Sequence, residues 1–252
     1  MKLNYSKKLT SFRNLTHAFT TKESGNLAFH VGDDLLNVEK NHLLLSNELL
    51  YDRALLVHMK QIHSDLVHIV SGEDDFFNPP TCDAIITDKT DIPLMVMVAD
   101  CAPLLFYDDA QKVIAVAHAG RAGAFKNIVK NVVACFVDEY KSKAEDIMVS
   151  IGANIGACCY EVGEEIFDEA SSLGLAYSIK KRDGSYYLDI NKILKKELLE
   201  CGVKEENIEI MGECSCCNTN RYFSYRKERE TGRFAGVLMM KKGTVQNSVS
   251  IG

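Results

Sequence analysis

Short apolar runs of strand length recur along the chain, separated by polar turns. Residues 94–99, 104–107 and 112–117 form three such runs, which are rich in Val, Leu, Ala and Met and too short for buried helices. Each run therefore predicts a covered β-strand. The polar tetrapeptide at residues 108–111 predicts a hairpin turn between the second and third runs.

Helical periodicity of apolar residues appears in four other segments. It predicts helices at residues 37–50 with Asn37 as N-cap, at 124–140 after a Gly-containing turn, at 160–173, and at 191–201 before Gly202. Further strands are predicted at residues 17–20, 54–70, 84–87, 147–152, 186–190, 208–211, 222–225 and 234–240. We expect one α+β domain over residues 1–252, with mixed β-sheets flanked by helices.

Composition narrows the class of protein. At 252 residues and 46% hydrophobic content the chain can bury a large core. Its formal charge of −6 argues against nucleic acid or an anionic membrane as a partner. No apolar run reaches membrane-spanning length. The nine cysteines suit reduced thiols better than a disulfide framework, so we expect a cytoplasmic protein; the oligomeric state is not indicated.

Three side chains that can bind metal lie at or within different predicted strands: His63, Cys101 and His118. Two imidazoles and a thiolate suit zinc, and three protein ligands leave a fourth position open, as in catalytic sites. Their wide separation in sequence matches no compact zinc-finger pattern. From spacing alone, separate core histidines and a buried cysteine are the favoured interpretation.

Several other residues carry alternative interpretations. The turn at residues 120–123, with Arg121, could seat an anion at a helix start or serve only packing. Asp100 is expected to cap a turn or accept a hydrogen bond from an imidazole. Arg226 and Arg233 could belong to a solvated face or reach a substrate phosphate, and for Arg233 the solvated face is the favoured interpretation. The cysteines at positions 158, 159, 214, 216 and 217 are interpreted as buried thiols, because no matching pair lies nearby in sequence.

Five ordered motifs carry a family resemblance. They are QIHS at residues 61–64, ADCAP at 99–103, AHAG at 117–120, IGANIGACCYEVG at 151–163, and FSYR at 223–226 followed by TGR at 231–233. Together they resemble the YfiH family, also described as the polyphenol oxidase, laccase-like or purine nucleoside phosphorylase group. The resemblance runs from residue 17 to residue 237.

The resemblance implies a function and assigns residues. It makes His63, Cys101 and His118 zinc ligands and catalytic residues, with copper as the other possible metal. It implies phosphorolysis of adenosine- or inosine-type nucleosides, with nucleoside and phosphate as partners, and deamination of adenosine. Substrate contacts are expected from Asn41, His42, Gln61, Arg121 and Arg226.

The chain departs from the family pattern at two places. The family usually has Trp-Arg-Gly where this chain has Arg121-Ala122-Gly123, and an arginine where this chain has His42. Three alternatives stay open: a cysteine-type amidase acting on peptidoglycan precursors with Cys101 as nucleophile, a copper-dependent polyphenol oxidase, and a non-enzymatic binding protein.

Overall fold

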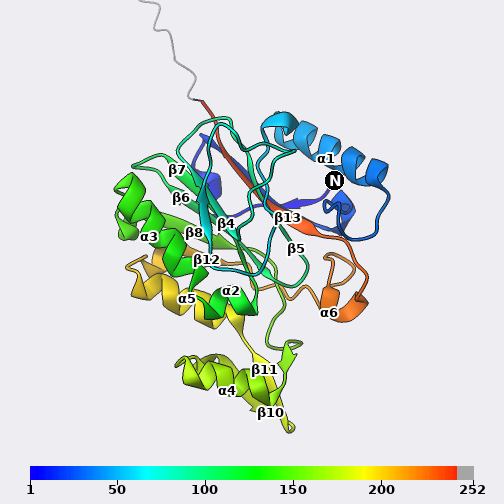
Figure 1. Ribbon diagram of the computed structural model, residues 1–252, viewed down its shortest axis with the longest axis vertical. Helices are drawn as coiled ribbons and strands as arrows, with labels where there is room; N and C mark the ends of the chain where they lie inside the picture. Colours follow the sequence, from blue (N-terminus) through cyan, green and yellow to red (C-terminus); the bar gives the residue numbers. More distant parts are fainter. Residues whose placement is uncertain (243–252) are drawn as a thin grey trace, which may run out of the picture.

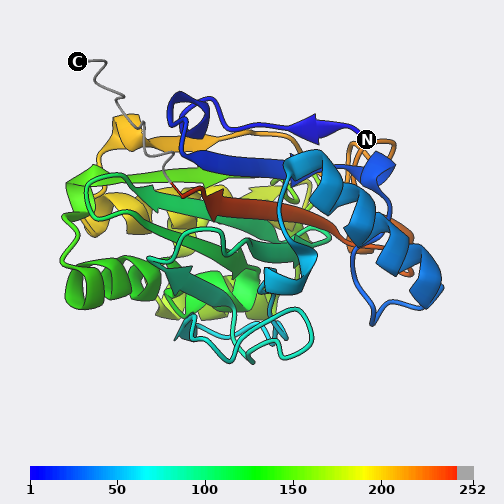
Figure 2. The same ribbon diagram turned by 90° about the horizontal axis from the view of Figure 1, so that it is seen from above.

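Two β-sheets packed face to face form the centre of the molecule, and helices cover their outer faces (Figure 1). The computed structural model describes residues 1–242. The four-stranded sheet is antiparallel and has the order β1 (Leu3–Asn4), β2 (Leu15–Thr20), β13 (Phe234–Met240) and β5 (Leu94–Val98). In Figure 2 the red strand β13 runs alongside the blue strand β2.

The second sheet has six strands of mixed direction. Its order is β12 (Ile208–Ile210), β8 (Ile147–Ile151), β6 (Ala102–Asp108), β7 (Val113–Ala119), β4 (Ala84–Thr87) and β3 (Val67–Ile69). The outer pairs β12–β8 and β3–β4 are parallel, and the inner pairs are antiparallel. The hairpin predicted at residues 108–111 is confirmed as the β6–β7 turn.

Alternation along β6 shows how the core is divided. Leu105 and Tyr107 pack between the two sheets, whereas Leu104 and Phe106 pack against the helices. Successive strand residues point to opposite faces, so a strand covered on both sides must be apolar throughout. This explains why the central strands read as uninterrupted apolar runs.

The helices form the two outer layers. Helix α1 (Leu35–Leu49) packs on the four-stranded sheet, and α2 (Arg121–Phe125), α3 (Ile128–Tyr140) and α5 (Ile190–Glu200) pack on the six-stranded sheet. A small sheet of β9 (Glu161–Val162), β11 (Ser185–Leu188) and β10 (Ile179–Arg182) projects at one end with α4 (Glu164–Ser172) (Figure 1). The short helix α6 (Tyr225–Glu228) precedes β13.

The expected class of mixed sheets flanked by helices is confirmed, but several element boundaries were wrong. Helix α1 starts at Leu35, because Asp34 rather than Asn37 caps it by accepting from the Leu36 N–H. The helix expected at residues 124–140 is two helices, since Asn127 has a φ of 66° and interrupts the helical conformation.

Three further segments differ from the prediction. Residues 54–70 contain one strand, the short β3. They begin inside a 3-10 turn (Arg53–Leu55), and the intervening residues are loop with isolated bridges at Val57 and Lys60. Residues 160–173 begin with β9 before α4 starts. Residues 222–225 are not a strand; the Ser224 side chain caps α6 instead. Within residues 1–242, no helix has the length and apolar content required to cross a bilayer.

Glu197 on α5 offers a test of the packing of the helical layer. Its side chain is buried, neither carboxylate oxygen has a hydrogen-bond partner, and burial raises its pKa to about 8. The pKa of this carboxyl group is 4.5 in the unfolded chain. At pH values between 4.5 and about 8, only the folded state keeps the proton on Glu197. Stability should therefore fall as pH rises through this window.

We expect Glu197→Gln to remove most of this pH dependence. It should raise the free energy of unfolding by roughly 1–3 kcal/mol at alkaline pH and change little under acid conditions, as measured by urea unfolding. Glu200→Gln on the same helix is the control, because Glu200 is solvent-accessible and paired with Lys130 and Lys196. An unchanged pH slope in Glu197→Gln would contradict the burial argument.

Candidate active site

The structure brings together the three residues that the sequence predicts as metal ligands. One ligand atom from each of His63, Cys101 and His118 lies within 4.8 Å of the others. The Cys101 Sγ is 3.9 Å from the His63 Nε2, and the two imidazole rings are 4.8 Å apart at 77°. We call these residues the His-Cys-His group.

Chain topology explains how the group forms. Strand β5 belongs to one sheet and β6 to the other, so the link that carries Cys101 crosses between the sheets. His118 lies opposite Pro103 in the β6–β7 register, at the same end of the sheet. His63 lies in the loop before β3, in a left-handed conformation with a φ of 58°. Three segments that are distant in sequence therefore converge at one edge of the two sheets.

Asp100 stabilises the crossing link. Its φ of 87° is unusual for a residue with a side chain. The Ser215 hydroxyl donates to one carboxylate oxygen at 2.6 Å, and the Arg226 backbone N–H donates to the other at 2.6 Å. Asp100 thus stabilises the turn beside Cys101. The hydrogen bond to an imidazole, which was the other expectation for Asp100, is made by another carboxylate.

That carboxylate is Asp83, which is fully buried. The His118 Nδ1 lies 2.8 Å from Asp83. Asp83 also accepts from the N–H groups of Ile62, His63 and Ser64 and from the Ser64 hydroxyl, at 2.6–3.2 Å. One side chain therefore fixes the segments of both histidines. Because His118 uses Nδ1 for this bond, its Nε2 is the atom available to a metal.

Charge inside the group favours the form of cysteine that binds metal. Burial alone would raise the pKa of Cys101, but His118 and His63 lower it to about 6. Burial would lower the pKa of His118, but Cys101 and Asp83 raise it to about 9. Burial also opposes ionisation of Asp83, yet His118 and Ser64 hold its pKa well below the usual range. A thiolate at Cys101 is thus accessible near neutral pH.

Local sterics also fit a small ion. A Cβ at Gly120 would lie 2.7 Å from the Cys101 Sγ and 3.2 Å from the His63 Cδ2. Only glycine leaves the group uncrowded at this position. Two imidazoles and one thiolate can hold a single zinc or copper ion with one coordination position left open.

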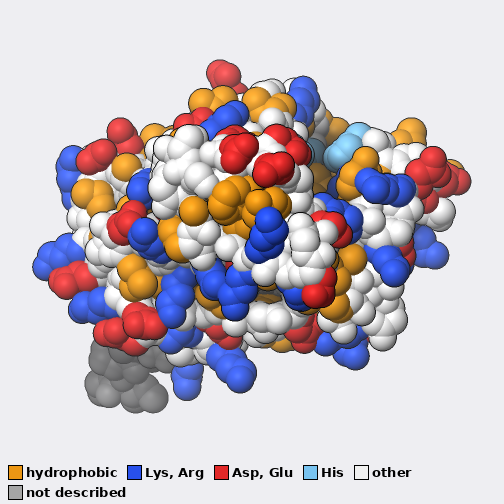
Figure 3. Space-filling model, turned by 90° about the horizontal axis from the view of Figure 1, so that it is seen from below, with side chains coloured by type: hydrophobic (Ala, Val, Ile, Leu, Met, Phe, Trp, Pro, Cys, Tyr) orange, Lys and Arg blue, Asp and Glu red, His pale blue; other side chains and the backbone are white. Residues whose placement is uncertain are grey.

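The group opens into a cavity of about 960 Å³. Aromatic side chains form part of its wall, at Phe29, Tyr160 and Tyr225. Its cationic lining residues are Lys60, Arg121, Arg226, Arg229 and Arg233. On the face seen in Figure 3, histidine side chains lie beside a recess, while Lys, Arg, Asp and Glu side chains are interspersed elsewhere. The volume and lining suit a small organic molecule that has an aromatic part and a negative charge.

Three of the residues predicted to contact substrate line this cavity. The Gln61 amide both donates to and accepts from the Met97 backbone, at 2.8 and 3.0 Å, so it ties the His63 loop to β5. Arg121 forms an ion pair with Glu169 at 2.6 Å. Arg226 donates to the Glu161 carbonyl at 2.8 Å. Helix α2 begins at Arg121 and has only five residues. The anion-binding site expected at residues 120–123 therefore lies at the start of a short helix.

Asn41 and His42 are not among the residues that line the cavity. His42 is fully buried, its Nε2 lies 2.8 Å from the Leu27 carbonyl oxygen, and its ring stacks on Phe29. Asn41 donates to the Asn26 carbonyl at 2.9 Å. The structure therefore gives no support for substrate contact by either residue. His42 instead supports Phe29, which is part of the cavity wall.

Several cavity residues were missed from the sequence. Arg233 is half-buried rather than solvated, and its guanidinium donates to the carbonyls of Thr231 and Gly232 at 2.8 and 3.0 Å. His30 and His58 also line the cavity. The TGR motif at residues 231–233 was the available signal for Arg233, whereas nothing in the local pattern marks the two histidines.

Comparison with known proteins identifies the family. A family model described as multi-copper polyphenol oxidoreductase laccase matches residues 9–241. The chain belongs to the YfiH family. It is 35% identical over 188 residues to a purine nucleoside phosphorylase of Clostridium acetobutylicum, covering 73% of this chain and 76% of that protein. It is 32% identical to a purine nucleoside phosphorylase of Corynebacterium glutamicum, covering 91% and 96%.

Solved structures of the family have the same fold. The hypothetical protein YfiH of Bacillus licheniformis superimposes with a TM-score of 0.89 at 26% identity, covering 95% of this chain and 96% of that chain. YlmD of Geobacillus stearothermophilus gives a TM-score of 0.85 at 26% identity, covering 94% of both chains. The four-layer arrangement of this chain is therefore the fold of the family.

The network around Asp83 leads to a prediction. Asp83→Asn keeps the shape but replaces one acceptor oxygen with an NH₂ group, so several donors lose their partner. We expect Zn²⁺ affinity at the His-Cys-His group to fall by about 10–100-fold. The free energy of unfolding should fall by roughly 2–4 kcal/mol. Chelator competition and urea unfolding measure the two effects.

Asp108→Asn is the matched control. Asp108 is equally buried and accepts from two backbone N–H groups, but it lies at the β6–β7 turn. Both N–H groups donate to one Asp108 oxygen, which Asn retains, so this substitution should leave Zn²⁺ affinity unchanged and cost less stability than Asp83→Asn. Equal loss of affinity in both variants would contradict the specific role of Asp83.

Proposed function

We propose that this chain is a zinc-dependent purine nucleoside phosphorylase. It would cleave adenosine- or inosine-type nucleosides with inorganic phosphate, giving the free base and ribose 1-phosphate. The observation that carries the proposal is the opening of the His-Cys-His group into a cavity that is both aromatic and cationic. The similarity to relatives named purine nucleoside phosphorylase supports the same activity.

The residues that would hold zinc are those of the His-Cys-His group, with Sγ of Cys101 and one imidazole nitrogen from each histidine as ligand atoms. Zinc supplies Lewis-acid chemistry when bound at such a site. Asp83 keeps His118 in the required tautomer by occupying its Nδ1. Asp100 holds the link beside Cys101 and thereby fixes the direction of the thiolate.

Phosphate would bind among the cationic side chains. Burial lowers the pKa of Arg233, which means that its charge is poorly solvated. An anion in the cavity would relieve this cost and form a charge-assisted hydrogen bond. Phe29, Tyr160 and Tyr225 offer flat apolar surface to a purine ring.

Deamination of adenosine is a second reaction that the site favours. The observation behind it is the open side of a three-ligand group, because hydrolytic deamination needs room for water beside the metal. This reaction needs no phosphate. Omitting phosphate therefore separates the two activities.

Two alternatives have weaker support. Within residues 1–242, the His-Cys-His group is the one metal-capable cluster that contains histidine, which fits a single ion better than a multi-copper centre. The closeness of Cys101 and His118 also resembles a nucleophile–base pair. That reading predicts activity without metal.

The decisive experiment measures product formation from adenosine and inosine with and without phosphate. Free base and ribose 1-phosphate should form only with phosphate, and inosine should form from adenosine in its absence. Cys101→Ala should reduce both rates by about 100-fold or more, since a zinc ligand is lost.

Cys135→Ala is the control, because Cys135 lies on α3 within the helical layer. Its rates should match those of the wild type. Base release that does not depend on phosphate would refute phosphorolysis. Activity that persists in metal-free protein and is abolished by alkylation of Cys101 would instead support the cysteine-nucleophile alternative.

Arg233→Ala tests the phosphate site. We expect the KM for phosphate to rise about tenfold with a smaller change in kcat, because a ground-state ionic contact is removed. Arg13→Ala is the control, since Arg13 is an exposed cation just before β2 and does not line the cavity. A KM for phosphate that Arg233→Ala leaves unchanged would remove Arg233 from the phosphate site.

A further inference from the structure

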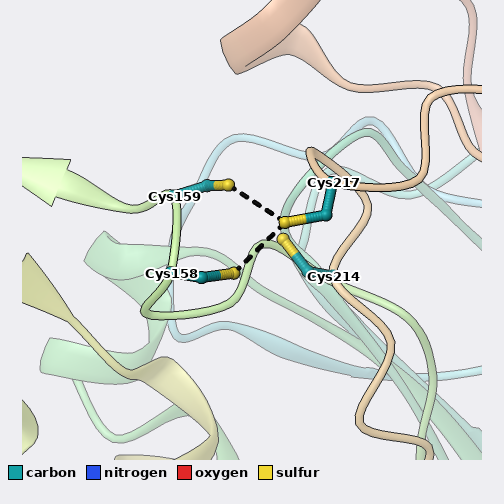
Figure 4. Close-up of side chains that lie close together, drawn as sticks. All are labelled: Cys158, Cys159, Cys214 and Cys217. Carbon is teal, nitrogen blue, oxygen red and sulfur yellow. Dashed lines mark hydrogen bonds between the residues drawn. The ribbon is translucent and has the colours of Figure 1, made fainter.

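Four cysteines form a second cluster, away from the His-Cys-His group. One Sγ from each of Cys158, Cys159, Cys214 and Cys217 lies within 4.8 Å of the others. Figure 4 shows all four side chains pointing toward a common centre. Cys158 and Cys217 are exposed, so the expectation of buried thiols was wrong for these two. Sequence alone could not pair them, because the two halves of the cluster are far apart along the chain.

We infer that these four cysteines bind one Zn²⁺ ion in a structural site of tetrahedral geometry. Zinc–sulfur bonds of about 2.3 Å place the sulfurs of a tetrahedral site about 3.8 Å apart. The Cys217 Sγ lies 3.4 Å from Cys158 and 3.3 Å from Cys159, and the remaining pairs stay within 4.8 Å. These separations match ligation of one ion and are too long for a disulfide.

Local backbone structure suits ligation by neighbouring cysteines. Adjacent residues in a strand point to opposite faces, but residues 157–159 form a turn, so Cys158 and Cys159 can approach the same point. Cys214 and Cys217 have the Cys-x-x-Cys spacing common in zinc sites and lie at a second turn. The Gly156 N–H donates to the Cys214 Sγ at 3.2 Å, which would stabilise a thiolate there.

Charges around the cluster favour the ion-bound form. Four thiolates and one Zn²⁺ ion carry a net charge of −2, and each thiol that binds releases its proton to solvent. Arg182 donates to the Cys158 carbonyl at 3.2 Å, and Arg226 donates to the Cys159 carbonyl at 3.3 Å. Two guanidinium groups thus lie at the backbone of the ligands and offset this charge.

The position of the cluster gives the ion a structural role. The two turns that carry the cysteines follow β8 and β12, which are parallel neighbours in the six-stranded sheet. An isolated β-bridge between Asn154 and Cys214 joins the two turns. Ser215, between two ligands, donates to Asp100. An ion here would fasten the two turns and thereby support the link that carries Cys101. This inference does not depend on the proposed enzymatic activity.

The test measures the number of zinc equivalents bound per chain in the full-length protein, purified under reducing conditions without chelator. Cys158→Ser and Cys217→Ser should each lose one equivalent of zinc relative to wild type. Cys216→Ser is the matched control, because Cys216 lies in the same turn but outside the four-cysteine group. Cys101→Ala should retain the ion of the four-cysteine cluster, which separates this site from the His-Cys-His group.

Spectroscopy on protein in which all four cysteines are intact keeps the proposal testable if a variant of the cluster fails to fold. Cobalt-substituted protein should show the intense thiolate-to-cobalt charge-transfer bands of a four-sulfur site, and X-ray absorption at the zinc edge should show sulfur-dominated ligation in Cys101→Ala. Equal zinc content in wild type and Cys217→Ser would overturn the proposal. So would a disulfide found by mass spectrometry among these cysteines, or iron in place of zinc.

Discussion

The buried carboxylate of Asp83 is the interaction on which the geometry of the site depends. It accepts hydrogen bonds from the His63 loop and from the His118 ring, although the two histidines belong to different elements. An uncompensated carboxylate would not be tolerated in such a position, so the charge can stay only while all its donors remain in place. The same bond decides which nitrogen of His118 faces Cys101, and so links the packing of the interior to the chemistry of the cavity.

The remaining parts of the site follow from the crossing between the two sheets. Cys101 lies where the chain leaves one sheet and enters the other, and Asp100 maintains that crossing through bonds to Ser215 and Arg226. Arg226 also contacts the turn that carries Cys159. The crossing and the cysteine cluster, both next to the cavity, are consequently joined by one connected set of hydrogen bonds.

Sequence patterns predicted those parts of the molecule in which the local periodicity of apolar residues matches their burial in the folded protein. The central strands were found because they are covered on both faces, and the family motifs located His63, Cys101 and His118. The patterns failed where side chains override periodicity, as at the Asn127 break and in the loop before β3. They also could not find Asp83 or pair the four cysteines, because these contacts exist only after distant segments have packed together.

The place of β13 within its sheet has a consequence for biosynthesis. This strand lies between β2 and β5 and pairs with both, although it comes from the C-terminal part of the described chain. During translation, β2 and β5 must wait with open backbone edges until residues 234–240 have emerged from the ribosome. A nascent chain that stalls before this point exposes two aggregation-prone edges, so this protein should rely on chaperones late in its synthesis rather than early.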